Sequence, residues 1–66
     1  MDEDKIEAAC ARLYNLINAA FSDVAYLREL TDKGKRQEFV ETYFDATAQN
    51  LSDASRLARA IAAGES

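Results

Sequence analysis

Apolar side chains recur at helical spacing along nearly the whole chain, and this periodicity restricts it to an all-α fold. In the first half, one heptad position holds Ile6, Leu13, Ala20 and Leu27. A companion position, four residues later in each repeat, holds Cys10, Ile17, Val24 and Thr31. The stripe persists for about seven turns, and a strand would need alternation at period two instead. The first half therefore predicts one long helix over about residues 3–31.

A second apolar stripe begins after Gly34 and predicts another long helix over about residues 36–63. Its two companion positions hold Val40, Thr47, Ala54 and Ile61, and then Phe44, Leu51 and Ala58. Gly64 suits a helix C-terminus, with Glu65 and Ser66 frayed beyond it. Residues 32–35, which include Gly34, are predicted to form the turn.

The segment Asn50–Asp53 offers one alternative to a continuous second helix. Ser52 or Asp53 would make a good N-cap, and a break near Ser52 would produce a monomeric three-helix bundle. The apolar phase passes through this segment without a shift, whereas a turn usually resets it. We therefore predict a single helical domain over residues 1–66, folded as an antiparallel hairpin of two long helices.

A chain this short buries too little apolar surface on its own to form a large core. Domains of about 60 residues bury only ~60% of the surface that their unfolded chains expose. The one cysteine, Cys10, cannot form an intramolecular disulfide, and the chain has no histidine for a structural zinc site. We expect two hairpins to dimerise into a four-helix bundle. The predicted core and interface residues are Leu13, Ile17, Phe21, Val24, Val40, Phe44, Leu51 and Ile61.

Residues that carry enzymatic chemistry are scarce. Histidine, the usual acid–base partner, is absent, and no glycine-rich phosphate loop or paired-cysteine motif occurs. Inward-facing carboxylates for a di-metal site are also lacking, because the glutamates lie off the apolar stripes or near the ends. We expect no catalytic, cofactor-binding or metal-binding residues. Cys10 is predicted to be a small buried hydrophobe on the stripe, with a redox-active thiol as the alternative.

Three polar or aromatic positions stand out against the apolar stripes. Thr47 and Asn50 are either tolerated edge residues or buried polar groups that set the register of the helices. Tyr26 lies outside the main heptad face, and exposed tyrosines are favoured anchors at interfaces. We therefore treat Tyr26 as a candidate contact for a partner.

The charges restrict the kinds of partner. The net charge is −4, so the whole chain has no general attraction to nucleic acid or to an anionic membrane. An 18-residue apolar run and a basic, apolar leader are both missing, which predicts a cytoplasmic protein. Basic residues nevertheless gather near the turn. Lys35 and Arg36 are placed at a predicted helix start, where the helix dipole disfavours cations, and are candidate partner contacts.

Two functional hypotheses follow from these observations. The first is a small non-enzymatic module that binds a partner protein through its helical surface, as a regulator, an adaptor or a phage or bacterial inhibitor. The alternative is a small dimeric regulator that binds nucleic acid through the basic turn region. Only the second predicts binding that weakens steeply with salt.

Overall fold

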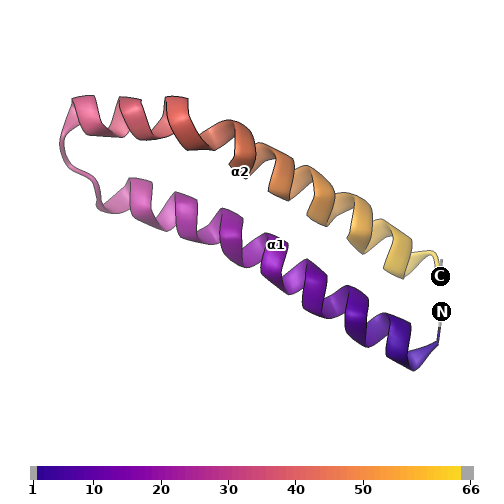
Figure 1. Cartoon of the computed structure of the whole chain (residues 1–66). Coiled ribbons are helices and arrows are strands. Elements are labelled where there is room, and N and C mark those ends of the chain that lie inside the picture. The colour runs from indigo at the N-terminus through magenta and orange to yellow at the C-terminus, as the bar shows by residue number, and fades with distance from the viewer. Residues whose placement is uncertain (1, 65–66) are drawn as a thin grey trace.

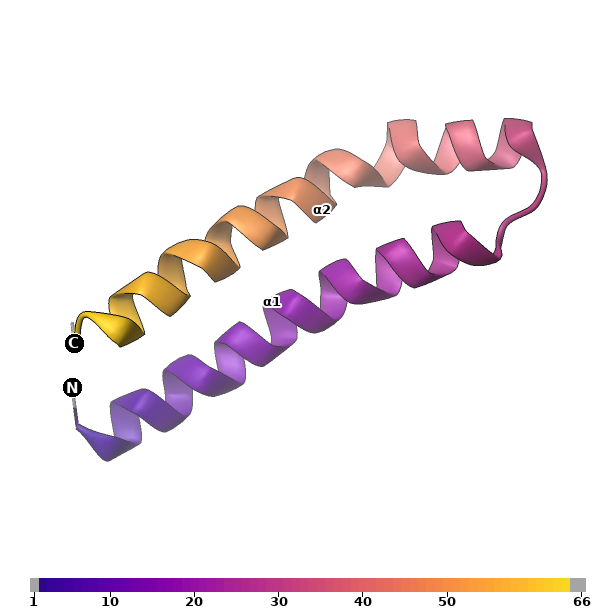
Figure 2. The ribbon, with the colours of Figure 1, turned by 180° about the vertical axis from the view of Figure 1, so that it is seen from behind.

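The computed structural model describes residues 2–64, which form two helices joined by a short connection (Figure 1). Helix α1 spans Glu3–Glu29 and helix α2 spans Lys33–Ala62. The helices lie side by side and antiparallel, so the start of α1 and the end of α2 are neighbours in both views (Figure 2). The predicted all-α hairpin is confirmed. Helix α2 runs without interruption through Ser52, which excludes the alternative with a third helix over the described residues.

The connection is shorter than predicted and lies earlier in the chain. Helix α1 ends at Glu29 rather than near residue 31, and α2 begins at Lys33 rather than near residue 36. The reason is the N-cap Asp32, whose side chain accepts a hydrogen bond of 3.0 Å from the backbone N–H of Lys35. Residues 30–32 therefore make the turn, and the expected turn at residues 32–35 is corrected.

The two glycines have different roles. Gly34 lies inside the first turn of α2 and has no positive φ, so it does not form the turn. A Cβ atom at Gly34 would come within 3.3 Å of the Asp32 carboxylate, which means that glycine leaves room for the cap. Gly64 has φ 72° just beyond the C-cap of α2, as the sequence predicted. Glu65 and Ser66 lie outside the described residues.

The helices meet along an inner face made of two heptad positions. The second position follows the first by three residues, as in Leu13 and Leu16, and not by four as predicted. On α1 this face carries Ile6, Ala9, Leu13, Leu16, Ala20, Asp23 and Leu27, and the C-cap Leu30 continues it; all are buried or half-buried. On α2 it carries Thr47, Asn50, Ala54, Leu57 and Ile61. The predicted companion residues Cys10, Ile17, Val24, Leu51 and Ala58 are exposed instead. The single chain therefore buries neighbouring positions, although the predicted companion residue Phe44 of α2 is half-buried.

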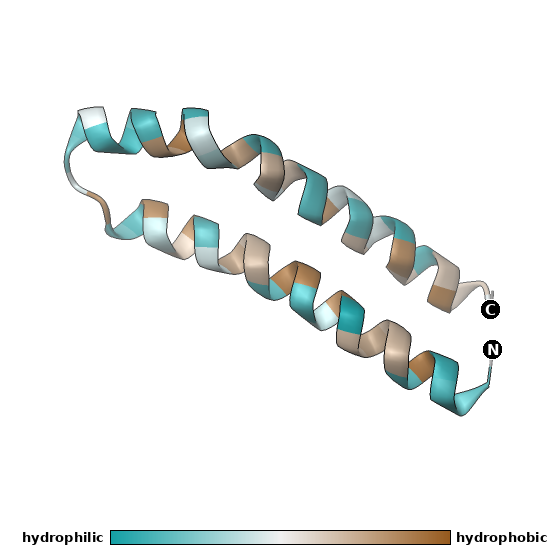
Figure 3. Ribbon diagram, viewed as in Figure 1, coloured by the Kyte–Doolittle hydropathy of each residue, from teal (hydrophilic) through white to brown (hydrophobic). Residues whose placement is uncertain are grey.

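Small side chains explain which face lies inside. The three most buried residues are Ala20, Thr47 and Ala54, at 2%, 2% and 6% exposure. Small side chains let two helices approach closely, because the separation of packed helices depends on the side chains at the contact. On α1 the stripe that carries Tyr14 and Phe21 is left on the outside. Apolar segments recur along the length of both ribbons (Figure 3).

The resulting molecule is elongated and has a thin core. It measures 48 × 15 × 13 Å, with a radius of gyration of 15.0 Å. A compact domain of this length would have a radius of gyration of about 11 Å. No large side chain is fully buried among residues 2–64. Much of the apolar surface of the chain therefore remains open.

Candidate functional site

An exposed apolar surface lies beside the inner face, and we call it the apolar side. It consists of Ile17, Phe21, Val24 and Leu51, which with Ala20 line a shallow depression of about 220 Å³. Their exposures are 50%, 68%, 42% and 51%. Tyr14, 69% exposed, continues the same stripe toward the start of α1. Side chains this large and this exposed on both helices are typical of a surface that contacts another protein.

A second surface, the aromatic cluster, lies near the turn and consists of Tyr26, Phe39 and Tyr43. The ring of Phe39 lies 4.9 Å from that of Tyr26 and 4.8 Å from that of Tyr43. Five residues, or about 140° around a helix, separate Tyr26 from Phe21, so this cluster and the apolar side face different directions. An open groove of about 350 Å³ runs along the cluster, lined by Tyr26, Leu30, Lys35, Glu38, Phe39 and Thr42.

The predicted core and interface residues divide into two groups. Leu13, Phe44 and Ile61 are half-buried in the single chain. The other five are exposed, namely Ile17, Phe21, Val24, Val40 and Leu51. Four of these five form the apolar side. The structure therefore brings four of the eight predicted residues together on one exposed surface, while the hairpin itself partly buries three others.

A polar pair crosses the inner face at mid-length. The hydroxyl of Thr47 donates a hydrogen bond of 2.6 Å to Oδ2 of Asp23, and it lies 3.2 Å from the carbonyl oxygen of Tyr43. Thr47 is buried and Asp23 is half-buried. Sequence reasoning missed Asp23, although its position three residues after Ala20 would have placed it on the inner face. This bond holds Asp23 of α1 and Thr47 of α2 at the same position along the long axis of the hairpin.

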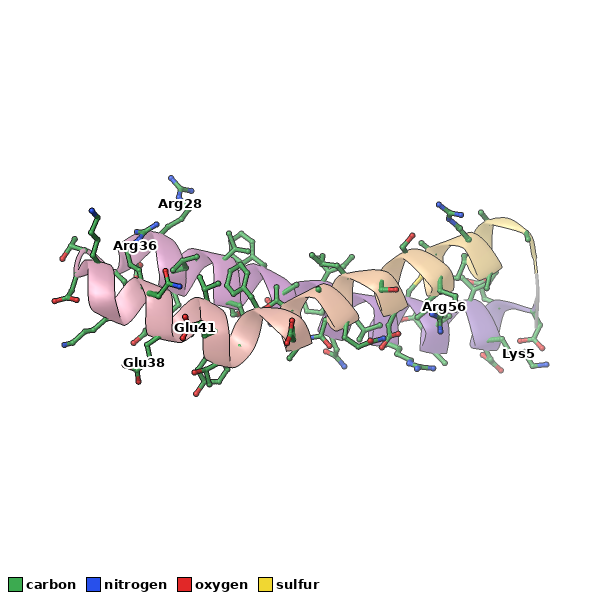
Figure 4. All side chains as sticks on the ribbon, turned by 90° about the horizontal axis from the view of Figure 1, so that it is seen from above. Lys5, Arg28, Arg36, Glu38, Glu41 and Arg56 are labelled. Carbon is green, nitrogen blue, oxygen red and sulfur yellow. The ribbon has the colours of Figure 1, made fainter. Side chains whose placement is uncertain are left out.

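The basic residues of the turn are partly used within the chain. Nη1 of Arg36 donates to the carbonyl oxygens of Leu27 and Leu30, at 3.1 and 2.8 Å. These carbonyls belong to the end of α1, where hydrogen-bond acceptors lack helical partners and the dipole favours a cation. Arg36 therefore stabilises the end of α1 although it belongs to the start of α2 (Figure 4). Lys35 is exposed and lines the groove beside the aromatic cluster.

The structure also bears on the cysteine, on metal sites and on membrane spans. Cys10 is exposed, so the expectation of a buried thiol is wrong for the single chain. Among residues 2–64, no three potential ligand side chains come together in a way that could hold a metal ion. Neither of the two described helices combines the length and the apolarity that crossing a membrane requires.

No protein-family model, no curated protein and no solved structure matches the chain. The case for a function therefore depends on the geometry and chemistry of the described residues.

Proposed function

We propose that this chain is a small non-enzymatic protein-binding module whose apolar side packs against a second copy to form a four-helix bundle. The observation that carries the proposal is the apolar side itself, where Ile17, Phe21 and Leu51 are each at least half exposed. Burying such side chains contributes about 25 cal/mol per Å² of apolar surface removed from water. The dimer then presents its remaining surfaces, including the aromatic cluster, to a further protein partner.

The dimensions of the hairpin support self-association. One long side of a molecule measuring 48 × 15 × 13 Å offers on the order of 700 Å². Stable interfaces of standard size bury about 800 Å² per partner, so a face-to-face contact would use the whole of this side. Small domains that lack disulfides and metals commonly gain the missing stability from a partner chain.

The chemistry of the apolar side supports a binding role. The side chains that line its depression are Ile17, Ala20, Phe21, Val24 and Leu51, none of which is an acid, a base or a nucleophile. The free, exposed thiol of Cys10 is consistent with a reducing compartment such as the cytoplasm.

Substitution of one exposed aromatic residue tests the proposal. Phe21→Glu places a charge in the apolar side, and we expect it to convert a dimer at micromolar concentration into a monomer in sedimentation velocity. Tyr26→Glu is the matched control, because Tyr26 is an exposed aromatic residue on the same helix that does not line the depression. The control should remain dimeric. A monomeric native chain, or a Phe21→Glu variant that dimerises like the native chain, would refute the proposal.

The same preparations test the nucleic-acid alternative. The guanidinium of Arg36 is engaged by the Leu27 and Leu30 carbonyls, which reduces the cationic surface available at the turn. We expect no salt-sensitive binding of RNA or DNA by the native dimer. Affinity that falls steeply with salt and weakens on Lys35→Ala would favour the alternative.

A further inference from the structure

We infer that the second copy docks with its α2 against α1, about a two-fold axis parallel to the helices, so that both turns lie at the same end of the bundle. By symmetry, its α1 packs against α2 of the first copy. The inference rests on the proposed function, because it specifies the dimer that the proposal requires. It commits to one of two arrangements in which antiparallel helices can pack face to face.

The register of this contact follows from the hairpin itself. The hydrogen bond between Thr47 and Asp23 places these residues at one level along the long axis. Each step forward along α1 is matched by an equal step back along α2, since both helices rise about 1.5 Å per residue. Phe21 thus lies at the level of residue 49, within one helical turn of Leu51, with which it lines the depression. A two-fold axis parallel to the helices preserves these levels between the copies.

Side-chain size makes the two helices complementary at these levels. The outer stripe of α1 carries the large residues Tyr14, Ile17, Phe21 and Val24. The outer positions of α2 at the same levels carry mostly small exposed residues, namely Ala48, Leu51, Ser55 and Ala58. In the inferred dimer Phe21 packs over Ala48 of the second copy, and Tyr14 packs over Ser55. Large side chains opposite small ones interdigitate and keep the helix separations equal.

The alternative arrangement, with α1 against α1 and the turns at opposite ends, loses this complementarity. Large residues would then face large ones on one pair of helices, and Ala48 and Ser55 would face similarly small residues on the other. The separation of packed helices follows the size of the side chains between them, so the two pairs would need unequal separations. A bundle with equal separations favours α1 against α2.

Charge complementarity at the turn end supports the same arrangement. Arg28 lies five residues beyond Asp23, and Glu41 lies six residues before Thr47, which brings both to nearly the same level. Both side chains are exposed and project from different helices (Figure 4). In the inferred dimer each Arg28 lies next to Glu41 of the other copy, which forms two ion pairs at the edge of the interface.

Distance measurement between spin labels tests the arrangement. A label at Lys33→Cys in a Cys10→Ser background marks the turn without entering the apolar side, since Lys33 is exposed in the first turn of α2. Turns at the same end predict a distance on the order of 20 Å between the two labels. Turns at opposite ends predict a distance close to the 48 Å length of the molecule. Dilution with unlabelled chain should remove the dipolar signal, which confirms that it arises between copies.

A charge exchange provides a second readout. Arg28→Glu alone and Glu41→Arg alone should each weaken dimerisation, by roughly threefold or more at low salt. The double variant should restore it, because the pairs re-form with reversed sign. In the alternative arrangement the two residues do not meet, and the double variant would show no rescue.

The outcomes separate this inference from the proposed function. A short label distance with rescue by the double variant supports the inferred arrangement. A sedimenting dimer with a long label distance, or without rescue, overturns the arrangement and leaves the dimer in place. A native chain that stays monomeric refutes both the proposed function and the inference.

Discussion

At the scale of single residues, the contact between Thr47 and Asp23 is the least expected feature of the hairpin. A buried threonine could be tolerated in a helix seam without a partner, because its hydroxyl can turn to the carbonyl one turn earlier. Here the hydroxyl lies 3.2 Å from the Tyr43 carbonyl and donates at 2.6 Å to a carboxylate on the other helix. Of the two readings that the sequence left open for Thr47, this geometry favours a role in setting the register.

Removal of the hydroxyl should expose its contribution. We expect Thr47→Val to lower the free energy of unfolding by about 1–2 kcal/mol, because the half-buried Asp23 carboxylate loses a hydrogen bond that the apolar isostere cannot replace. Thr47→Ser keeps the hydroxyl and should recover part of the loss. Urea denaturation at one fixed protein concentration measures the difference.

Thr42→Val is the matched control for this prediction, since Thr42 is an exposed threonine on the same helix. It should change stability by less than about 0.5 kcal/mol. Equal effects at Thr47 and Thr42 would show that the hydrogen bond to Asp23 contributes nothing. Replacement of both partners, as in Asp23→Leu with Thr47→Val, should cost less than the sum of the single changes.

At the scale of secondary-structure elements, the start of α2 explains an apparent conflict. Its first turn contains no acidic residue and carries cations where the dipole disfavours them. Arg36 resolves part of this conflict by bonding the carbonyls at the end of α1. The N-cap Asp32 supplies the negative charge that the first turn lacks. The short connection therefore allows one helix start to stabilise the end of its neighbour.

Arg36→Ala should therefore weaken α1 although the residue belongs to α2. We expect a loss of about 0.5–1.5 kcal/mol in the free energy of unfolding, since two carbonyl groups lose their donor. Lys33→Ala is the control, and removal of this cation from the N-terminal turn should be neutral or slightly stabilising. Thermal unfolding followed by circular dichroism measures both. A loss at Lys33 equal to that at Arg36 would contradict the proposed role of the guanidinium.

At the scale of the whole molecule, the hairpin is too thin to bury its own large side chains. The fully inward residues are small, whereas Tyr14 and Phe21 remain more than two-thirds exposed. In the proposed dimer a second copy would cover the apolar side and stabilise the fold. Folding and association should then be linked, since the partner binds only the folded chain.

This linkage predicts unfolding that depends on protein concentration. The melting temperature of the native chain should rise with each tenfold increase in concentration, and the transition should stay cooperative. Phe21→Glu should abolish the dependence because it removes the proposed contact between copies. Circular dichroism melts over a hundredfold concentration range measure both variants. A melting temperature that is constant over that range would contradict the linkage.

Much of this architecture was readable from the sequence, because the signals that determine it are local. Apolar spacing predicted two long helices and the continuity of α2 through Ser52, and a glycine with φ 72° ends that helix as expected. The turn was misplaced because the prediction assigned Gly34 to it, whereas Asp32 is the N-cap and Gly34 lies inside the first turn of α2. A capping carboxylate at residue 32 begins the helix earlier, and glycine within the first turn accommodates it.

The tertiary structure decides which of two neighbouring apolar faces of each helix is buried. Each helix carries two adjacent stripes of similar apolar content, and the periodicity of one helix alone does not rank them. The ranking depends on the other helix, because Ala20, Thr47 and Ala54 let the backbones approach and bring Asp23 to Thr47. The sequence by itself thus determined the helices and their antiparallel pairing. Only the packing between them decided that Ile17, Phe21, Val24 and Leu51 remain outside, available to a partner.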